Sequence, residues 1–289
     1  MGTLNPTDSE IPRELQEVWP ELDWSNADVV HGAFHRVIRF DTSAVLRVAI
    51  GTAHEARSRS ELHNLETLGS LNLPCEIPTP HSEVHTCGLG SAYLTSFVPG
   101  ELLDDPGWEV VREPIATTLV ALHSATLPDG ATLRPTREWC GGMAWPDLVD
   151  RIVHNLDGGL RRRAATIVAQ VLEVEQSIPR VVVHGDFGPH NLLFSDDDAL
   201  GLIDFDNACL GDPAIDIAPL IGIFGSAAVS DVADAEMIRR GRVHRASLSL
   251  QVAAAAHLVG DSKLRDHALR NFAARVRAGT LYEPTPRAR

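Results

Sequence analysis

The chain has 289 residues, long enough for one large domain or two closely packed ones. Apolar residues make up 44% of it and charged residues 22%, a balance that excludes a disordered or fibrous protein. Its 39 acidic and 25 basic residues give a net charge of −14, which disfavours nucleic acids and anionic membranes as partners and favours a cationic small molecule.

The acidic residues are concentrated in residues 1–200, which hold 29 of the 39 acids but 14 of the 25 bases. Of the bases, 24 are arginine, and Lys263 is the only lysine. Any mechanism that needs a catalytic lysine elsewhere in the chain is therefore excluded.

Neither the cysteines nor the N-terminus indicates export. The four cysteines have no C-x-x-C spacing and predict reduced, mostly buried thiols. The N-terminus lacks a basic start followed by an apolar run, and no apolar stretch approaches about 18 residues. We expect a cytoplasmic protein without a membrane segment or an obligate protein partner.

The first hundred residues are rich in predicted strands. Val29–Phe40 and Val45–Ile50 read as two strands joined by a short polar turn. Two shorter strands are expected over Glu83–Cys87 and Ser91–Val98, and they end at the turn Pro99-Gly100.

A helix is predicted between these pairs of strands. Thr52 and Glu55 fit a capping box at its start, and Gly69 fits its C-terminal stop. Glu61 shares the apolar stripe with Leu65 and Leu68, so we expect this carboxylate to face the core.

From Trp108 onward the pattern is mainly helical. Two short apolar strands, Val181–Val183 and Leu200–Phe205, interrupt it. After Asp212-Pro213, a favourable helix start, the chain reads as helical to about Ala278. The sequence predicts an α+β protein with a β-rich N-terminal domain, residues 1–98, and a larger helical domain, residues 99–289.

The residues that indicate chemistry lie around these two short strands. Asp186 follows the first strand, Asn191 lies five residues later, and Asp204 comes at the end of the second strand. Phosphoryl transfer needs such a set, because one carboxylate accepts the proton of the acceptor hydroxyl while oxygen ligands hold Mg²⁺ against nucleotide phosphates. Each residue alone fits an ordinary turn or cap, but the combination favours a kinase loop of the form H-x-D-x-x-x-x-N.

The stretches VVVHGDFGPHNLLF (181–194) and GLIDFDNACLGDPAIDIA (201–218) resemble the aminoglycoside phosphotransferase family of antibiotic kinases. The resemblance extends to LTSFVPGELL (94–103) and covers about residues 27–225. It implies a bilobal, protein-kinase-like fold that uses ATP or GTP with Mg²⁺. It also implies that Asp186 is the catalytic base and that Asn191 and Asp204 bind the metal.

In the small lobe, a kinase needs a cation that holds the nucleotide phosphates. Because lysine is absent there, the best candidate is Arg47, with Glu61 as its partner. An ordinary edge-strand role for Arg47 stays open.

Further nucleotide contacts are expected from two segments. His31 and Gly32 lie in the loop that takes the place of a glycine-rich loop, although it contains a single glycine and its histidines fit ordinary surface or core roles. At the hinge, the resemblance assigns the backbone of Ser96 and Val98 to the nucleobase.

Other residues are expected to support the site. His184 and Asp216 are predicted to brace the catalytic loop, and Asp206 is either a metal or substrate ligand or a solvent-facing acid. The run Asp196-Asp197-Asp198 is read as a solvated turn.

For the acceptor, the acidic character favours a cationic antibiotic, either an aminoglycoside or a cyclic peptide of the viomycin and capreomycin type. A macrolide 2'-phosphotransferase remains an alternative, as does a metabolite kinase for choline, homoserine or a sugar. The hypotheses from other classes are a nucleotide-binding regulator without turnover and a metal hydrolase built on His184, Asp186 and His190.

Overall fold

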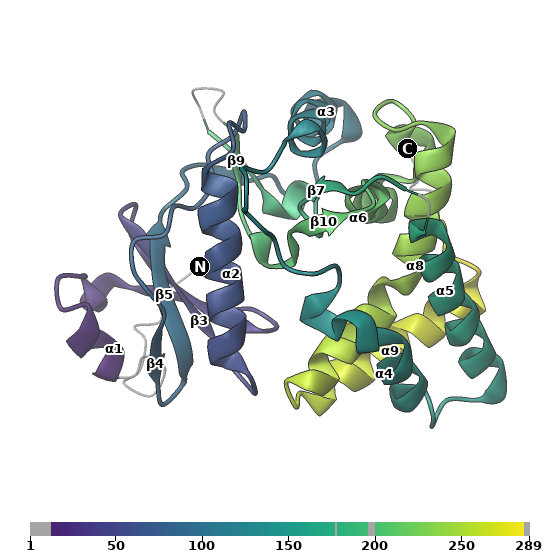
Figure 1. Ribbon diagram of the computed structural model, residues 1–289, viewed down its shortest axis with the longest axis horizontal. Helices are drawn as coiled ribbons and strands as arrows, with labels where there is room; N and C mark the ends of the chain where they lie inside the picture. Colours follow the sequence, from purple (N-terminus) through teal and green to yellow (C-terminus); the bar gives the residue numbers. More distant parts are fainter. Residues whose placement is uncertain (1–12, 177, 196–199, 286–289) are drawn as a thin grey trace.

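The computed structural model describes residues 13–176, 178–195 and 200–285 and shows two lobes joined by an extended segment (Figure 1). The small lobe is a β-sheet with one long helix, and the large lobe is mainly helical. The predicted α+β, bilobal fold is confirmed. The run Asp196–Asp198 lies outside the described residues.

The small-lobe sheet is antiparallel throughout and has the strand order β1-β2-β3-β5-β4. Its strands are β1 (Asp28–His31), β2 (His35–Phe40), β3 (Ala44–Ala49), β4 (His85–Cys87) and β5 (Gly90–Ser96). The single strand expected over Val29–Phe40 is therefore wrong. The chain turns at Gly32, whose N–H donates to the carbonyl of His35 at 2.8 Å, and this hairpin points its tip toward the large lobe.

Helix α2 (His54–Gly69) lies against the face of the sheet that looks toward the large lobe (Figure 1). Its end at Gly69 is confirmed, but the capping box is wrong. The hydroxyl of Thr52 instead donates to the carbonyl of Leu258 at 2.5 Å, so it joins the two lobes. Helix α1 (Arg13–Val18) packs on the opposite face of the sheet through Leu15.

The large lobe contains seven α-helices among the described residues, and Figure 1 shows α4, α5, α8 and α9 grouped together. They are α3 (Trp108–Ser124), α4 (Trp145–Ile152), α5 (Gly158–Glu175), α6 (Ala214–Phe224), α7 (Ser226–Val229), α8 (Ala235–Leu258) and α9 (Ser262–Ala278). Helix α6 starts one residue later than predicted, with Pro213 in place of Asp212 at its N-cap, and the Asp212 carboxylate just before it accepts from the Ala214 amide at 2.9 Å.

Two small sheets lie between the helices and the small lobe. One pairs β7 (Val181–Val183) with β10 (Cys209–Gly211). The other contains β6 (Glu101–Leu102), β8 (Leu192–Phe194) and β9 (Leu200–Leu202). The chain leaves the small-lobe sheet after Ser96 and pairs with the large lobe at Glu101, a passage that contains the predicted boundary.

One apolar cluster spans both lobes and positions the site. Leu65 and Leu68 of α2 share it with Ile115 of α3 and with Phe187 in the catalytic loop. Cys140 and Cys209 are buried and the four cysteines are free, as predicted. None of the helices in the described part of the chain is long and apolar enough to cross a membrane.

Candidate active site

Asp186 lies just after β7, in a loop that depends on Gly185. Gly185 has a φ of +88°, and a Cβ added there would lie 2.4 Å from the carbonyl oxygen of Asn207. Glycine is therefore needed for both conformation and space. The Asp186 side chain is 43% exposed, so it is accessible to a substrate hydroxyl, and it lies 3.4 Å from Nε2 of His190.

The loop is held from below by a fully buried carboxylate. Asp216 of α6 accepts from the amides of His184 at 3.1 Å and Gly185 at 2.8 Å, and it pairs with His123 at 3.0 Å. The His184 ring in turn lies 2.9 Å from the Ile203 carbonyl, which links this loop to the segment that bears Asp204. His184 and Asp216 thus lie where a bracing role requires them.

Asn191 and Asp204 approach the cleft from two sides of this loop. The Asn191 side-chain NH₂ donates to the Asp186 carbonyl at 2.9 Å, which leaves its side-chain oxygen available as a ligand. Asp204 follows β9 in a left-handed conformation, with a φ of 67°, and its side chain is 45% exposed. Burial of its surroundings and the nearby Asp206 carboxylate raise the pKa of Asp204. The side chains of Asn191 and Asp204 offer the hard oxygen atoms that Mg²⁺ prefers.

Arg47 of β3 extends across the cleft to these same carboxylates. Its guanidinium lies 3.2 Å from Asp204 and makes a shorter contact with Asp206. The pairing of Arg47 with Glu61 expected from the sequence is not formed here. The arginine instead lies against the two carboxylates of the opposite lobe.

Glu61 instead pairs with His35 at the start of β2, a histidine for which an ordinary surface or core role was expected. Nε2 of His35 lies 2.9 Å from Glu61, and its Nδ1 lies 3.4 Å from Asp206. Burial opposes protonation, but the charges of Glu61 and Asp206 raise the pKa of His35 above its ordinary value. The ring therefore links α2 to the Asp204–Asp206 turn across the two lobes.

These residues surround one cleft of about 370 Å³ between the lobes. Six of the predicted site residues line it: Gly32, Arg47, Glu61, Asp186, Asp204 and Asp206. Asn191, His184 and Asp216 are buried and are not among its lining residues, and neither is His31, which is exposed at the end of β1.

The hinge residues lie apart from this cleft. The Ser96 amide donates to the carbonyl of Thr79 and its hydroxyl accepts from the Thr79 amide, so these two groups are already bonded within the protein. Val98 is buried and passes over Gly201, where an added Cβ would lie 2.5 Å from its side chain.

Sequence reasoning missed a segment that ties the lobes together, residues 131–140. The Arg134 amide donates to Asn64 of α2 at 3.0 Å, and its guanidinium donates to the carbonyl of Asp206 at 2.5 Å. Glu138 accepts from Arg134 and from Ser60 of α2, and the next residue, Trp139, lines the cleft. The segment is irregular, so no periodicity could have indicated it.

The model of the phosphotransferase enzyme family matches residues 27–251, which include every residue that lines the cleft except Val252. The chain belongs to this family. It is an O-phosphotransferase, a kinase that binds a nucleotide.

Among characterised relatives, the viomycin phosphotransferase of Streptomyces vinaceus is 27% identical over 81% of this chain and 88% of its own length. The homoserine kinase of Sinorhizobium medicae is 32% identical over 54% of this chain and 48% of its own length. The first similarity covers nearly all of the relative, whereas the second spans about half of it.

Solved structures show the same fold at lower identity. The GDP and kanamycin complex of APH(2")-IIia has a TM-score of 0.68 at 14% identity and covers 92% of this chain and 97% of that one. Macrolide 2'-phosphotransferase type I has a TM-score of 0.67 at 20% identity and covers 94% and 99%.

Proposed function

We propose that this phosphotransferase moves the terminal phosphate of ATP or GTP to a hydroxyl of a cationic antibiotic of the viomycin type, with Asp186 as the catalytic base. The observation that carries the proposal is the single cleft in which Asp186, Asp204 and Arg47 face one another. A similarity to viomycin phosphotransferase over most of both chains supports the choice of acceptor.

Each residue has a role that follows from its position. Asp186 is half-exposed beside the cleft and accepts the hydroxyl proton as the acceptor oxygen attacks phosphorus. Asp216 holds the Asp186 loop through the amides of His184 and Gly185, so the base is positioned before substrate binds.

Asn191 and Asp204 would hold Mg²⁺, which supplies positive charge against the phosphate oxygens when it is bound. Arg47, freed from Asp204 and Asp206 when the metal and nucleotide bind, would contact the phosphates. His31, Ser96 and Val98 stay candidates for nucleotide contacts; for Ser96, the backbone carbonyl is the group to test, since its amide is bonded to Thr79.

The test is a substrate panel with purified protein. Release of ADP or GDP is measured with viomycin, kanamycin, a macrolide and homoserine, and mass spectrometry checks the acceptor for one added phosphoryl group. We expect acceptor-dependent turnover with viomycin. Absence of turnover with every antibiotic would refute the proposal.

Homoserine is the second candidate acceptor, because several homoserine kinases match the chain at 29% to 37% identity. Those similarities cover 26% to 54% of the chain. Turnover with homoserine but with no antibiotic would favour this metabolite kinase.

A further inference from the structure

One part of the large-lobe side of the cleft is apolar, apart from the catalytic loop and the Asp204–Asp206 turn. Leu248 and Val252 lie one turn apart on α8 and line the cleft together with Trp139. We call these three residues the Trp139 wall. Phe34, at the tip of the β1–β2 hairpin, packs against the same apolar cluster as Trp139 and Val252, so aromatic side chains from both lobes meet there.

Trp139 is well placed to contact an acceptor. It lines both the main cleft and a small adjoining cavity beside Gly185 and Asn207, next to the base Asp186. Its ring is half-buried, and among the described residues no group accepts a hydrogen bond from its indole N–H. A ring with one accessible edge and a free donor suits a ligand with a planar or apolar surface.

Each carboxylate that lines the cleft already has a cationic partner or a proposed catalytic role. The four that line it are Glu61, Asp186, Asp204 and Asp206. Glu61 is paired with His35, Asp204 and Asp206 contact Arg47, and Asp186 is the proposed base. Among the described residues, no carboxylate from α4, α5, α8 or α9 lines the cleft. An acceptor that carries ammonium groups on every side would therefore lack partners on this wall.

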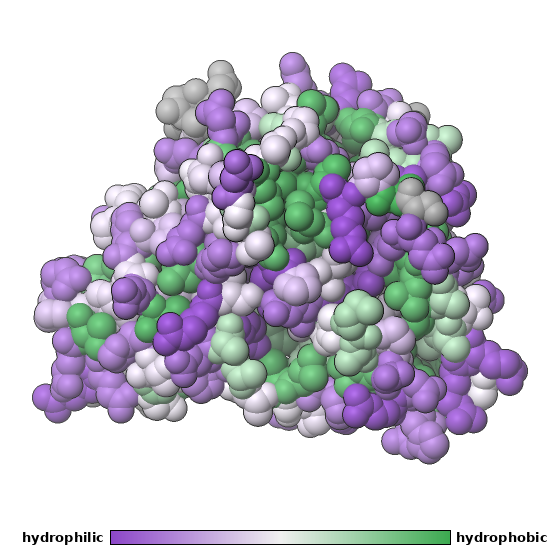
Figure 2. All heavy atoms as spheres, viewed as in Figure 1, coloured by the Kyte–Doolittle hydropathy of each residue, from purple (hydrophilic) through white to green (hydrophobic). Residues whose placement is uncertain are grey.

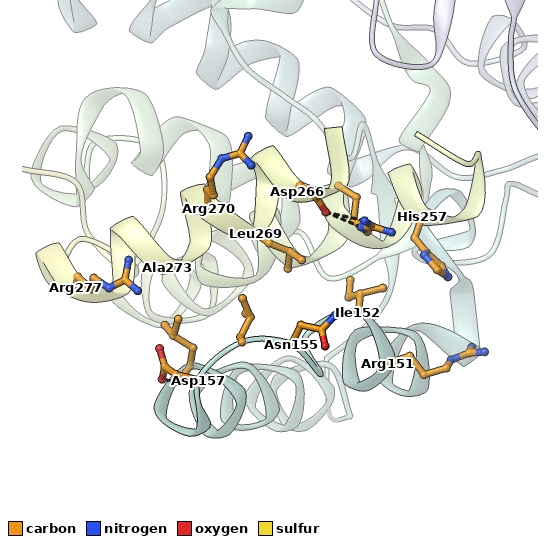
Figure 3. Close-up of a pocket in the computed structure, with 13 residues that line it drawn as sticks. Arg151, Ile152, Asn155, Asp157, His257, Asp266, Leu269, Arg270, Ala273 and Arg277 are labelled. Atoms are coloured by element: carbon orange, nitrogen blue, oxygen red, sulfur yellow. Dashed lines mark hydrogen bonds and ion pairs between the residues drawn. The ribbon is translucent and has the colours of Figure 1, made fainter. Parts of the chain in front are cut away.

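A larger groove in the large lobe does not supply such partners either. It measures about 920 Å³ and lies between α9 and the α4–α5 region (Figure 3). Its lining includes Arg151, Arg265, Arg270 and Arg277, whereas Asp157 caps α5 and Asp266 is paired with Arg265. This balance disfavours a polycation in the groove.

Hydrophilic side chains cover most of the rim of the face shown in Figure 2, and the largest apolar area on that face lies in its upper middle, over the part of the large lobe where Figure 1 shows α3, β7 and α6. The Trp139 wall is therefore assigned from the residues that line the cleft.

We propose that Trp139, supported by Leu248 and Val252, is the specificity-determining residue that binds a planar or apolar face of the acceptor. The acceptor class is then an amphipathic macrocyclic antibiotic with one cationic face, rather than an aminoglycoside with ammonium groups throughout. This inference rests on the proposed function, because it assigns the acceptor for that same site.

The experiment compares acceptors and variants in steady-state kinetics. We expect viomycin, a cationic cyclic peptide, to have a kcat/KM at least about tenfold above that of kanamycin. Trp139→Ala should raise the KM for viomycin about tenfold, and Trp139→Phe, which keeps an aromatic face, about twofold. Viomycin should quench tryptophan fluorescence in the native protein and not in Trp139→Phe.

The matched control is Trp108→Phe on α3, whose indole donates to Asp231 away from the cleft. Trp108→Phe should leave the KM for viomycin, the KM for the nucleotide and the fluorescence quenching by viomycin unchanged. Leu248→Ala provides a second test of the wall if Trp139→Ala folds poorly, and it should raise the KM for viomycin about threefold.

The outcomes separate the two proposals. If viomycin is phosphorylated but Trp139→Ala leaves its KM unchanged, or raises the nucleotide KM in parallel, the specificity role is overturned while the antibiotic kinase stands. A higher kcat/KM for kanamycin than for viomycin also overturns the specificity role of Trp139. Turnover with homoserine alone overturns the proposed function, and this inference falls with it.

Discussion

The two sides of the cleft differ in how their charged groups are held. On the large-lobe side, the catalytic loop is fixed by hydrogen bonds to the buried Asp216, and each of the Asp216 oxygens has a partner. On the small-lobe side, Arg47 and His35 contact carboxylates of the Asp204–Asp206 turn across the cleft. The loop that bears the proposed base is thus held by contacts within the large lobe, whereas Arg47, if it binds phosphate as proposed, must leave its contacts with the opposite lobe.

The strongest test of the fixed side is Asp186→Asn. Loss of the base should lower kcat about 1,000-fold, because general base catalysis contributes 10²- to 10⁴-fold. The acceptor-dependent release of ADP or GDP measures it. The melting temperature should not change, since the side chain is half-exposed. A variant that retains more than about a tenth of the native kcat would show that another group accepts the proton.

Asp216→Ala tests the support beneath that loop. It leaves the amides of His184 and Gly185 without an acceptor in a buried place, which should cost about 3 kcal/mol of unfolding free energy and lower kcat. Thermal and urea unfolding measure the loss. Asp231→Ala is the matched control, because Asp231 is exposed and pairs with Arg112 at the surface. Equal stability of the two variants would contradict a bracing role for Asp216.

Substitutions of Arg47 test the small-lobe side of the cleft. Arg47→Ala should raise the nucleotide KM about tenfold. Arg47→Lys should raise it less, because lysine keeps the positive charge but lacks the forked hydrogen-bond donors of the guanidinium. The KM for the acceptor should move much less in either variant. Arg59→Lys, on the exposed face of α2, is the conservative control. If the nucleotide KM stays at its native value in Arg47→Ala, Arg47 has only a structural role.

The smallest expected effect concerns acid stability at the start of α6. Burial opposes ionisation of Asp212, but hydrogen bonds from His244, the Ala214 amide and Arg240 lower its pKa below the ordinary 3.8. A lowered pKa stabilises the fold above about pH 4, and this contribution is lost as the pH falls through the folded-state value. The free energy of unfolding, measured in urea, should therefore fall less steeply from pH 6 to pH 3 in Asp212→Asn than in the native protein. An identical slope would mean that Asp212 does not titrate in this range.

Much of the catalytic side could be predicted from sequence because its residues are close along the chain. The spacing of Asp186, Asn191 and Asp204 around short apolar strands indicates a kinase loop, and His184 and Asp216 lie within the same motif. Residues only a few positions apart on strands and tight turns have few possible arrangements. In the structure Asp186 and Asp204 line the cleft, and hydrogen bonds join Asn191, His184 and Asp216 to the segments that bear them.

The small-lobe pairs could not be predicted in the same way. Arg47 and Asp204 are 157 residues apart, and His35 is 26 residues from Glu61. Which carboxylate each cation meets depends on how α2 and the β1–β2 hairpin pack against the large lobe. The position of Trp139 could not be predicted either, because contacts of its segment with α2 and with the Asp206 turn determine it.

By itself, the sequence determined that no lysine can bind phosphate in the small lobe, because none precedes Lys263, and it predicted Arg47 for that role. It also predicted the order of base and metal ligands along the chain, because this prediction depends on local spacing. Only the tertiary structure decided that Arg47 lies against Asp204 and Asp206, that His35 takes Glu61, and that an aromatic side chain lies beside the base. Those contacts join segments that are distant in sequence, and packing between the lobes alone brings them together.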